Sequence, residues 1–265
     1  MPSDIPSARR TGYQPFAAFL LAAASLTALA TPETNHLFAV RAAAEFRRAQ
    51  IQLQADTNNP AAAWQFARAC YDLADFATND TERATLAIQG IAASRQLLVR
   101  RPESAPGHYY LGMDLGQLAR TEILGALKIV KEMEREFKRA DDLDEHFDYA
   151  GPARCLGLLY RGAPGWPTSI GSRRKAREWL ERAARLAPDY PENHLNLIES
   201  RLNWNDRAGA ERELKTLDAL WPKAQTNFVG EAWEPGWADW TARKGAAEQA
   251  LTQTPSTAES PKARH

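Results

Sequence analysis

The chain of 265 residues has only two cysteines, three methionines and no excess of charge of either sign. Its 33 basic and 33 acidic side chains give a net charge of zero. This balance argues against a nucleic-acid binder, because such proteins carry a basic excess or stripe. Cys70 and Cys155 lie in helical patterns in repeats that are not adjacent, whereas a disulfide needs Cα atoms within about 7 Å. We therefore expect two buried free thiols rather than a disulfide.

Sequence motifs of catalysis and metal binding are also missing. The chain has no G-x-S-x-G, no phosphate-binding glycine loop, no H-E-x-x-H and no Cys–His pairing. His146 lies in the acidic run Asp141–Asp148, which forms either a metal cluster or a solvated turn between repeats. No spacing in this run matches a known metal cage. We therefore predict a protein that is not an enzyme and that needs no cofactor or metal.

Long apolar runs are absent except near the N-terminus. Phe16–Ala30 is apolar, follows two arginines and ends in the small residues that signal peptidases prefer. We interpret residues 1–30 as a secretion signal that is cleaved before Thr31. A retained anchor is the alternative, although a membrane span needs about 20 apolar residues. No cysteine follows the run to take a lipid, so the sequence predicts a periplasmic protein without a membrane span after cleavage.

What the chain does contain is helical periodicity. One spacing recurs, in which a small residue is followed by a large apolar residue, another apolar residue and finally a proline. Small residues let paired helices approach closely, large ones fill the gap, and proline ends a helix because it has no N–H to donate. The positions are Ala176, Leu180, Ala183 and Pro188, and again Ala210, Leu214, Leu217 and Pro222. This pattern resembles the second helix of a tetratricopeptide (TPR) repeat.

The remaining periodic segments extend this resemblance over most of the chain. Leu111-Gly112 and Leu156-Gly157 occur in equivalent places, and Tyr160 completes the L-G-x-x-Y pattern of the family. First helices are predicted at residues 60–76, 105–120, 149–161 and 191–203, and second helices at residues 82–100, 123–139, 172–186 and 208–220. Further helices are predicted at residues 36–54 and 231–252. No segment alternates as a strand would.

We therefore predict an all-α, TPR-like solenoid of helical hairpins with a capping helix at each end, because repeat arrays need polar caps. The expected segments are a secretion signal (1–30), an N-terminal cap (31–58), the repeat array (59–222), a Trp-rich C-terminal cap (223–251) and a disordered tail (252–265). The tryptophans of the last cap either close the final repeat or form a platform for a sugar or peptide.

In the TPR family the first helices line a concave groove, so the resemblance implies which side chains face it here. Those side chains are Trp64, Arg68, Tyr71, Tyr109, Met113, Arg154, Leu158 and Arg161. Aromatic rings and three arginines would suit an apolar ligand that carries a carboxylate, since arginine binds carboxylates with two parallel hydrogen bonds. Alternatively, the arginines pair with nearby acids such as Asp72 or Glu199.

The third hairpin is interrupted by residues 162–171, in which prolines and glycines exclude a helix. The next helix opens with three cations, where the helix dipole prefers anions. One interpretation is an anion site, because backbone N–H groups and basic side chains converge there. The other is local compensation, for example of Arg174 by Glu178. The residues of the candidate anion site are Trp166, Ser172, Arg173 and Arg174.

The signal segment, the irregular hairpins and the stretch from Leu156 to Tyr190 are similar to the T component associated with TRAP-type transporters. That family is all-α and built from cryptic TPR hairpins, and the resemblance implies a periplasmic solute-binding protein as partner. We therefore predict an exported adaptor that binds a protein partner, a peptide or a small carboxylate in its groove. The alternative is a structural scaffold for envelope assemblies without a small-molecule ligand. The sequence leaves a homo-oligomer open.

Overall fold

The computed structural model describes residues 32–122 and 125–253, and these residues form ten α-helices and one short 3-10 helix with no β-strand. The predicted signal peptide and its cleavage site lie outside the described residues. Most of the predicted disordered tail does too, because the described chain ends at Gln253.

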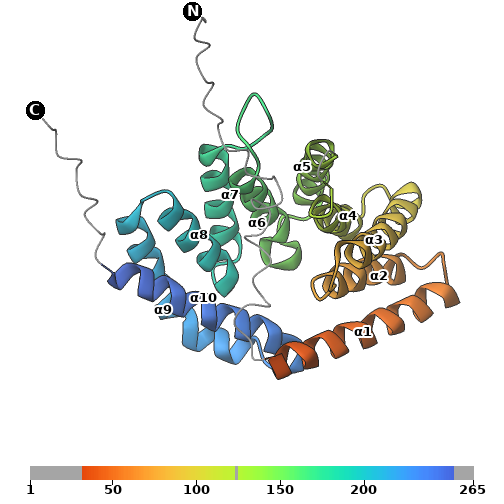
Figure 1. Cartoon of the computed structure of the whole chain (residues 1–265), viewed down its shortest axis with the longest axis horizontal. Helices are drawn as coiled ribbons and strands as arrows, with labels where there is room; N and C mark the ends of the chain where they lie inside the picture. Colours follow the sequence, from red (N-terminus) through yellow and green to blue (C-terminus); the bar gives the residue numbers. More distant parts are fainter. Residues whose placement is uncertain (1–31, 123–124, 254–265) are drawn as a thin grey trace, which may run out of the picture.

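Four helical hairpins follow one another along the chain (Figure 1). They are α2 (Pro60–Ala74) with α3 (Asp80–Arg100), α4 (Ala105–Ala119) with α5 (Ala126–Leu143), α6 (Phe147–Gly162) with α7 (Arg173–Leu186), and α8 (Pro191–Asn203) with α9 (Arg207–Asn227). α1 (Pro32–Ala55) precedes the hairpins, and η4 (Glu231–Trp233) and α10 (Glu234–Thr252) follow them. The predicted all-α solenoid of hairpins is confirmed.

The helices begin where the sequence places capping residues. The side chains of Asn79, Ser172 and Asp206 each accept a hydrogen bond from a backbone N–H in the first turn of α3, α7 and α9. Such caps satisfy N–H groups that have no partner within the helix. Pro60 and Pro191 open α2 and α8, where a missing N–H costs nothing. Local sequence therefore sets most of the hairpin boundaries.

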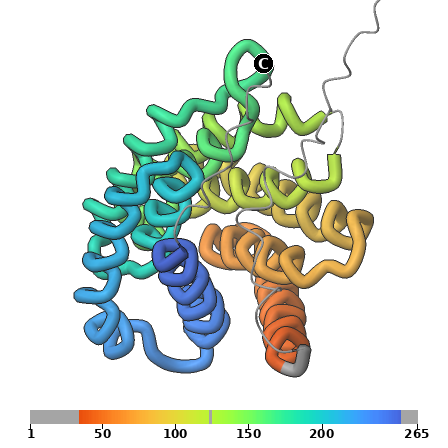
Figure 2. The backbone as a smooth tube through the Cα atoms, turned by 60° about the vertical axis from the view of Figure 1, so that its left-hand side comes forward, coloured from red at the N-terminus to blue at the C-terminus, as the bar shows by residue number. Residues whose placement is uncertain are grey.

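The first helices of the hairpins form the inner layer of a curved array. α2 packs against α4, α4 against α6 and α6 against α8, whereas neighbouring second helices make no comparable contact in the described part of the chain. The first-helix layer therefore has the smaller radius and forms the concave side. The curvature brings the two ends of the array together (Figure 2), and Arg41 of α1 forms an ion pair with Glu234 of α10.

Glycines in two first helices allow close contact within a hairpin. A Cβ atom at Gly112 would lie 2.5 Å from the ring of Phe137, and one at Gly157 would lie 2.6 Å from the side chain of Leu180. Both distances are shorter than real Cβ contacts, so only glycine fits. The paired Leu-Gly motifs therefore mark the places where first and second helices touch.

Two histidines in equivalent positions tie each hairpin to the turn before it. In α4, His108 Nδ1 lies 2.6 Å from Glu136 Oε2, and its Nε2 lies 2.9 Å from a carbonyl oxygen of the preceding turn. In α8, His194 repeats the arrangement with Glu213 at 2.7 Å and a turn carbonyl at 2.8 Å. These residues have a structural role at the seams between hairpins.

The largest error in a predicted helix end is in the last hairpin. The second helix of the last hairpin was expected to stop at Leu220 because of Pro222, but α9 continues to Asn227. Proline within a helix removes one hydrogen bond. The helix continues because Leu217, Ala224 and the following Phe228 pack in the apolar cluster that α10 closes.

Candidate functional site

Two of the eight residues predicted to line the groove lie beneath its surface. Tyr109 packs in the core between the hairpins and is almost completely buried. Its hydroxyl donates a hydrogen bond of 2.7 Å to Asp148 Oδ2. Arg154 is also buried. The other six keep part of their surface exposed, and they are Trp64, Arg68, Tyr71, Met113, Leu158 and Arg161.

Arg154 stabilises an unusual turn at the start of α6. Asp148, Tyr149 and Ala150 have φ angles of 49°, 55° and 61°, a left-handed region that costs energy for residues other than glycine. Arg154 donates to the carbonyl oxygens of Asp148 and Tyr149 at 3.3 and 3.2 Å, and to the Asp148 carboxylate at 2.9 Å. Asn193 donates to the Tyr149 carbonyl at 3.0 Å and accepts from Arg154 at 3.2 Å. The hydrogen-bond donors of this guanidinium are therefore taken up largely by the protein's own backbone.

The other two groove arginines are paired with acids of the chain. Arg68 Nε lies 3.5 Å from Asp72 Oδ2. Arg161 donates to Ser200 Oγ at 2.9 Å and lies 3.8 Å from Glu199 Oε2. Both pairings match the alternative drawn from the sequence. The positive charge available to a carboxylate ligand is therefore small.

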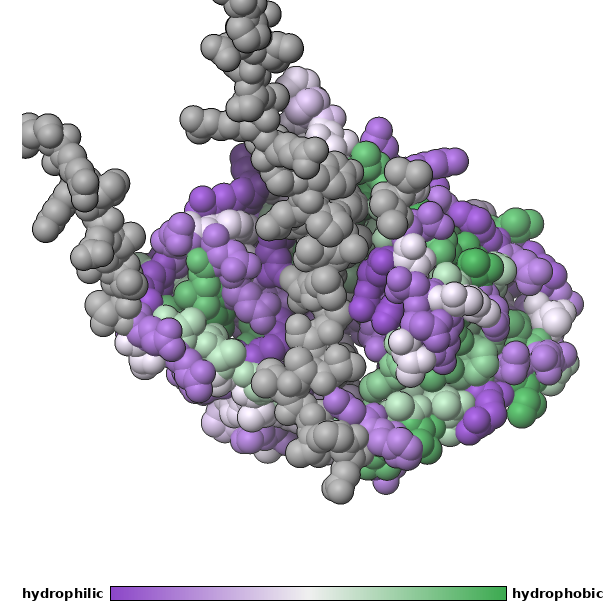
Figure 3. Space-filling model, viewed as in Figure 1, coloured by the Kyte–Doolittle hydropathy of each residue, from purple (hydrophilic) through white to green (hydrophobic). Residues whose placement is uncertain are grey.

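Carboxylates on the concave side are held in an unfavourable environment. The surrounding protein partly desolvates Asp72 and raises its pKa to about 6, although 48% of its side chain stays exposed; Arg68 opposes this shift, and the charges of Asp75 and Asp148 add to it. Burial also raises the pKa of Asp75, against a hydrogen bond from Gln117 of 2.7 Å. Desolvation thus acts on both acids, and repulsion by neighbouring carboxylates adds to it at Asp72. On the part of this face that is coloured in Figure 3, hydrophilic residues lie among hydrophobic ones.

The C-terminal tryptophans lie mainly in a packed core. Trp240 is 2% exposed, and Trp237 donates its indole N–H to the Phe228 carbonyl at 2.6 Å. At the edge of this cluster Tyr149 stacks on Tyr190, with ring centroids 4.6 Å apart and an interplanar angle of 11°. The structure thus shows the tryptophans closing the last repeat, which was one of the two interpretations. Tyr149 remains partly exposed.

Three of the four residues of the predicted anion site are engaged in separate contacts. Ser172 accepts from the backbone N–H of Lys175, which makes it the cap of α7. Arg174 pairs with Glu178 at 2.6 Å, which is the alternative given above. Arg173 donates to the carbonyl of Trp204 at 2.9 Å. None of these contacts leaves a cation aimed at the helix N-terminus.

Trp166, the fourth of these residues, lies in an ordered loop between α6 and α7. The loop is closed by a hydrogen bond of 2.8 Å from Gly171 N to Pro164 O and another of 2.9 Å from Ser172 N to Tyr160 O. Trp166 is 89% exposed. A large aromatic side chain held in solvent by a fixed loop is available to a partner.

The Gly171→Ala variant is expected to lose thermal stability because the loop closes tightly at this residue. A Cβ atom here would lie 2.0 Å from Ala163 O and 2.7 Å from Pro164 O, which are backbone atoms that cannot rotate away. Gly165→Ala is the matched control, since the nearest atom to its Cβ would be 3.8 Å away. Thermal unfolding followed by circular dichroism should show a lower midpoint for Gly171→Ala alone. Equal midpoints would contradict the packing described for this loop.

The two cysteines are free thiols, as the sequence predicted. Cys70 is fully buried in α2, and Cys155 is partly buried in α6, where its Sγ lies 3.5 Å from Met113 Sδ. Burial raises the pKa of both thiols, that of Cys155 to about 12. A thiol that stays protonated is a poor nucleophile and metal ligand. Neither cysteine is therefore placed to act as a nucleophile or a metal ligand.

Sequence reasoning missed a buried carboxylate at the seam between the first two hairpins. Asp114 of α4 is completely buried, and neither of its oxygens has a hydrogen-bond partner among the described residues. It lies against Gly90 of α3, where a Cβ atom would be 2.2 Å from Oδ2. The signal was present, because Asp114 follows Tyr110 and Leu111 at the spacing of one buried helix face.

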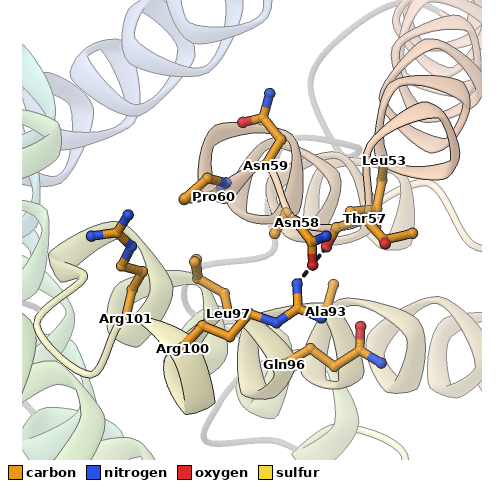
Figure 4. A pocket seen from close by; sticks show the side chains of 11 residues that line it. Leu53, Thr57, Asn58, Asn59, Pro60, Ala93, Gln96, Leu97, Arg100 and Arg101 are labelled. Carbon is orange, nitrogen blue, oxygen red and sulfur yellow. Dashed lines mark hydrogen bonds between the residues drawn. The ribbon is translucent and has the colours of Figure 1, made fainter.

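A small hollow lies outside the concave groove, between the α1–α2 turn and the end of α3 (Figure 4). Its volume is about 380 Å³, and Arg100 donates across it to the carbonyl of Thr57 at 2.8 Å. None of the predicted groove residues lines it. In the part of the chain that the structure describes, no group of three His, Cys, Asp or Glu residues could hold a metal ion. Within these same ranges, no helix is long and apolar enough to cross a bilayer.

The curved double layer of hairpins and its partly exposed inner face define a helical-repeat scaffold. No protein-family model and no curated protein matches the chain. Among solved structures it is similar to a thermophilic TPR protein from Thermus thermophilus, with a TM-score of 0.57 and 20% identity over 81% of this chain and 94% of that chain. At this identity the likeness concerns the fold. The fold is a TPR-like helical-hairpin solenoid, and this comparison gives no support to the finer resemblance to the T component of TRAP-type transporters.

Proposed function

We propose that this protein is a binding adaptor that holds a segment of a partner protein in its concave groove. The observation that carries the proposal is the inner layer of first helices, which leaves apolar and polar side chains such as Leu158, Tyr71 and Arg68 partly exposed. A residue that faces solvent on the inner side of a curved array is free to contact a ligand. Repeat scaffolds of this kind use extended concave surfaces for binding.

A peptide segment fits this surface better than a small carboxylate. The three groove arginines are engaged by Asp72, Asp148 and Glu199. A free carboxylate would have to displace one of these acids to gain a charge-assisted hydrogen bond. A peptide instead gains from contacts spread along four helices.

The location and the partner proposed for the adaptor are supported by the sequence alone. The signal-like segment supports export to the periplasm, and the resemblance to TRAP-associated proteins supports a solute-binding protein as partner. We also propose that the adaptor has no catalytic activity, since no nucleophile lies beside a base in the recognised motifs.

The second candidate function is a scaffold that holds envelope proteins through its outer surface. The observation in its favour is the exposure of apolar side chains away from the groove. Trp166 lies on the α6–α7 loop, and Val99 near the end of α3 is 85% exposed. Exposed aromatic and aliphatic anchors often carry the energy of protein–protein contacts.

The Leu158→Ala variant distinguishes these two functions. Peptides would be selected from a displayed random library against the full chain, and their affinities measured by fluorescence anisotropy. We expect Leu158→Ala to weaken binding by about tenfold or more, a loss of about 1.4 kcal/mol, because it removes an apolar side chain from the inner face. Val99→Ala makes a similar truncation on α3 and should leave the affinity unchanged. Loss of binding only in Val99→Ala would contradict binding in the groove and support the scaffold.

A further inference from the structure

The ion pairs along the concave side are unequal in exposure. In the pair of Arg154 with Glu192, at 3.7 Å, the arginine side chain is 6% exposed and the glutamate 29%. In the pair of Arg161 with Glu199, at 3.8 Å, the values are 8% and 27%. Each guanidinium is therefore sunk into the wall while its carboxylate stays accessible. On α6 and α8 a partner in the groove therefore meets the acids and not the arginines, whereas on α2 Arg68 is itself exposed beside Asp72.

The same asymmetry holds at both ends of this row of charges. Glu199 also binds Arg243 of α10 at 2.6 Å, and that arginine side chain is mostly buried. Asp148 is more exposed than Arg154, with which it pairs at 2.9 Å. A carboxylate oxygen can accept more than one hydrogen bond, so an internal ion pair leaves room for a second donor. The part of the groove formed by α6 and α8 is therefore acidic at its surface.

An aromatic ring lies beside two of these acids. Tyr149 directly follows Asp148 and stacks on Tyr190, whose hydroxyl donates to Glu192 Oε2 at 3.2 Å. The ring of Tyr149 is 40% exposed. A partly exposed aromatic face next to carboxylates attracts a cation by both charge and the ring quadrupole. Lysine and arginine side chains have this chemistry.

A buried amide on the same helix face lacks a partner. Asn196 of α8 is 2% exposed, and its Oδ1 accepts from Arg243 at 2.7 Å. Its Nδ2 has no hydrogen-bond partner among the described residues. Asn196 lies four residues after Glu192 and three before Glu199, so the three share one face of α8. Because this nitrogen is enclosed by the protein, Asn196 supports the α8 face from within and is not presented to a ligand.

We propose that the concave groove binds a basic segment of the partner protein, with a lysine or arginine side chain over Tyr149 and between Asp148 and Glu192. The inference rests on the proposed adaptor function and adds the chemistry of the partner. Charge complementarity carries it, because the surface offered to the groove is acidic on α6 and α8. The occupant is a cationic peptide segment rather than an anionic ligand.

The test compares two fluorescent peptides, one alternating lysine with alanine and one alternating glutamate with alanine. Their affinities for the full chain would be measured by anisotropy near physiological ionic strength. We expect the lysine peptide to bind at least about tenfold more tightly. The double variant Asp72→Asn/Glu192→Gln should weaken it by about tenfold, since it removes Glu192 from the proposed lysine site and Asp72, which is close enough to Asp148 for their charges to interact. Arg154 keeps Asp148 in this variant, so the turn at α6 is retained.

The matched control is Glu178→Gln/Glu211→Gln, which removes two exposed acids of α7 and α9 and has the same net charge. It should keep the affinity of the parent chain. An equal loss in both double variants would overturn the proposal, because long-range charge would then explain the binding. Equal affinities for the two peptides would also overturn it.

The outcome can be separated from a failure of the adaptor function. Library peptides that bind in a Leu158-dependent way but contain no basic residues would remove this inference and leave the adaptor standing. If the binding of the library peptides does not depend on Leu158, both this inference and the adaptor function are contradicted. Enrichment of lysine and arginine among Leu158-dependent peptides would support both.

Discussion

Replacing Arg154 by methionine is expected to lower the free energy of unfolding by about 3–5 kcal/mol, the range found when one partner of a buried ion pair is removed. Methionine keeps much of the side-chain volume but none of the donors. Asp148 and Asn193 would lose their guanidinium partner. Two backbone carbonyls of the left-handed turn would also lose a donor. Chemical denaturation followed by far-UV circular dichroism measures the change.

Arg174→Met is the matched control for this substitution. Arg174 pairs with Glu178 on the surface of α7, and both side chains are exposed. Exposed ion pairs contribute about 0–1 kcal/mol, so this variant should unfold almost as the parent chain does. If both variants lose the same stability, the role given to Arg154 in the α6 turn is incorrect. The comparison thus separates a buried network from a general effect of arginine loss.

Helix positions could be predicted because their signals are local. Pro191 and Asn203 bound α8 as expected, and α2 and α4 begin at Pro60 and Ala105 as expected. Each of these boundaries depends on a capping residue or a proline within the same turn. The end of α9 could not be predicted, because packing of the segment after Pro222 against α10 outweighs the cost of the proline.

The groove could be predicted as a surface but not as a set of contacts. Helical spacing places Leu158 and Arg161 on the inner layer, and the structure keeps both partly exposed. The pair of Arg68 with Asp72 is local, but other partners lie about 40 positions away in the chain, as with Arg161 and Ser200. Periodicity within one helix carries no information about such pairs. The left-handed residues at the start of α6 could not be predicted from the sequence either, since none of them is glycine.

The Asp114→Asn variant is expected to be more stable than the parent chain at neutral pH by more than about 1.4 kcal/mol, the equivalent of one pKa unit, because the amide avoids the cost of holding a buried carboxyl against its ionisation. Burial raises the pKa of Asp114 well above its usual range, and the charge of Asp72 adds to the shift. Because the folded state holds this proton more tightly than the unfolded chain, the protonated carboxyl favours folding at low pH. That contribution is lost as the pH rises from the ordinary Asp value of about 4 through the raised pKa of the folded state.

Asparagine has nearly the shape of aspartate, so the close contact with Gly90 should be preserved while the ionisation is removed. Stability measured by denaturant titration at several pH values should therefore depend less on pH in Asp114→Asn than in the parent chain above about pH 4. Asp189→Asn removes an exposed acid that pairs with Lys223, and it should leave the pH profile nearly unchanged. If Asp114→Asn has the same dependence of stability on pH as the parent chain, Asp114 is not the group that couples folding to pH. A flatter profile would instead show that the seam between the first two hairpins contains an acid that opposes folding when it ionises.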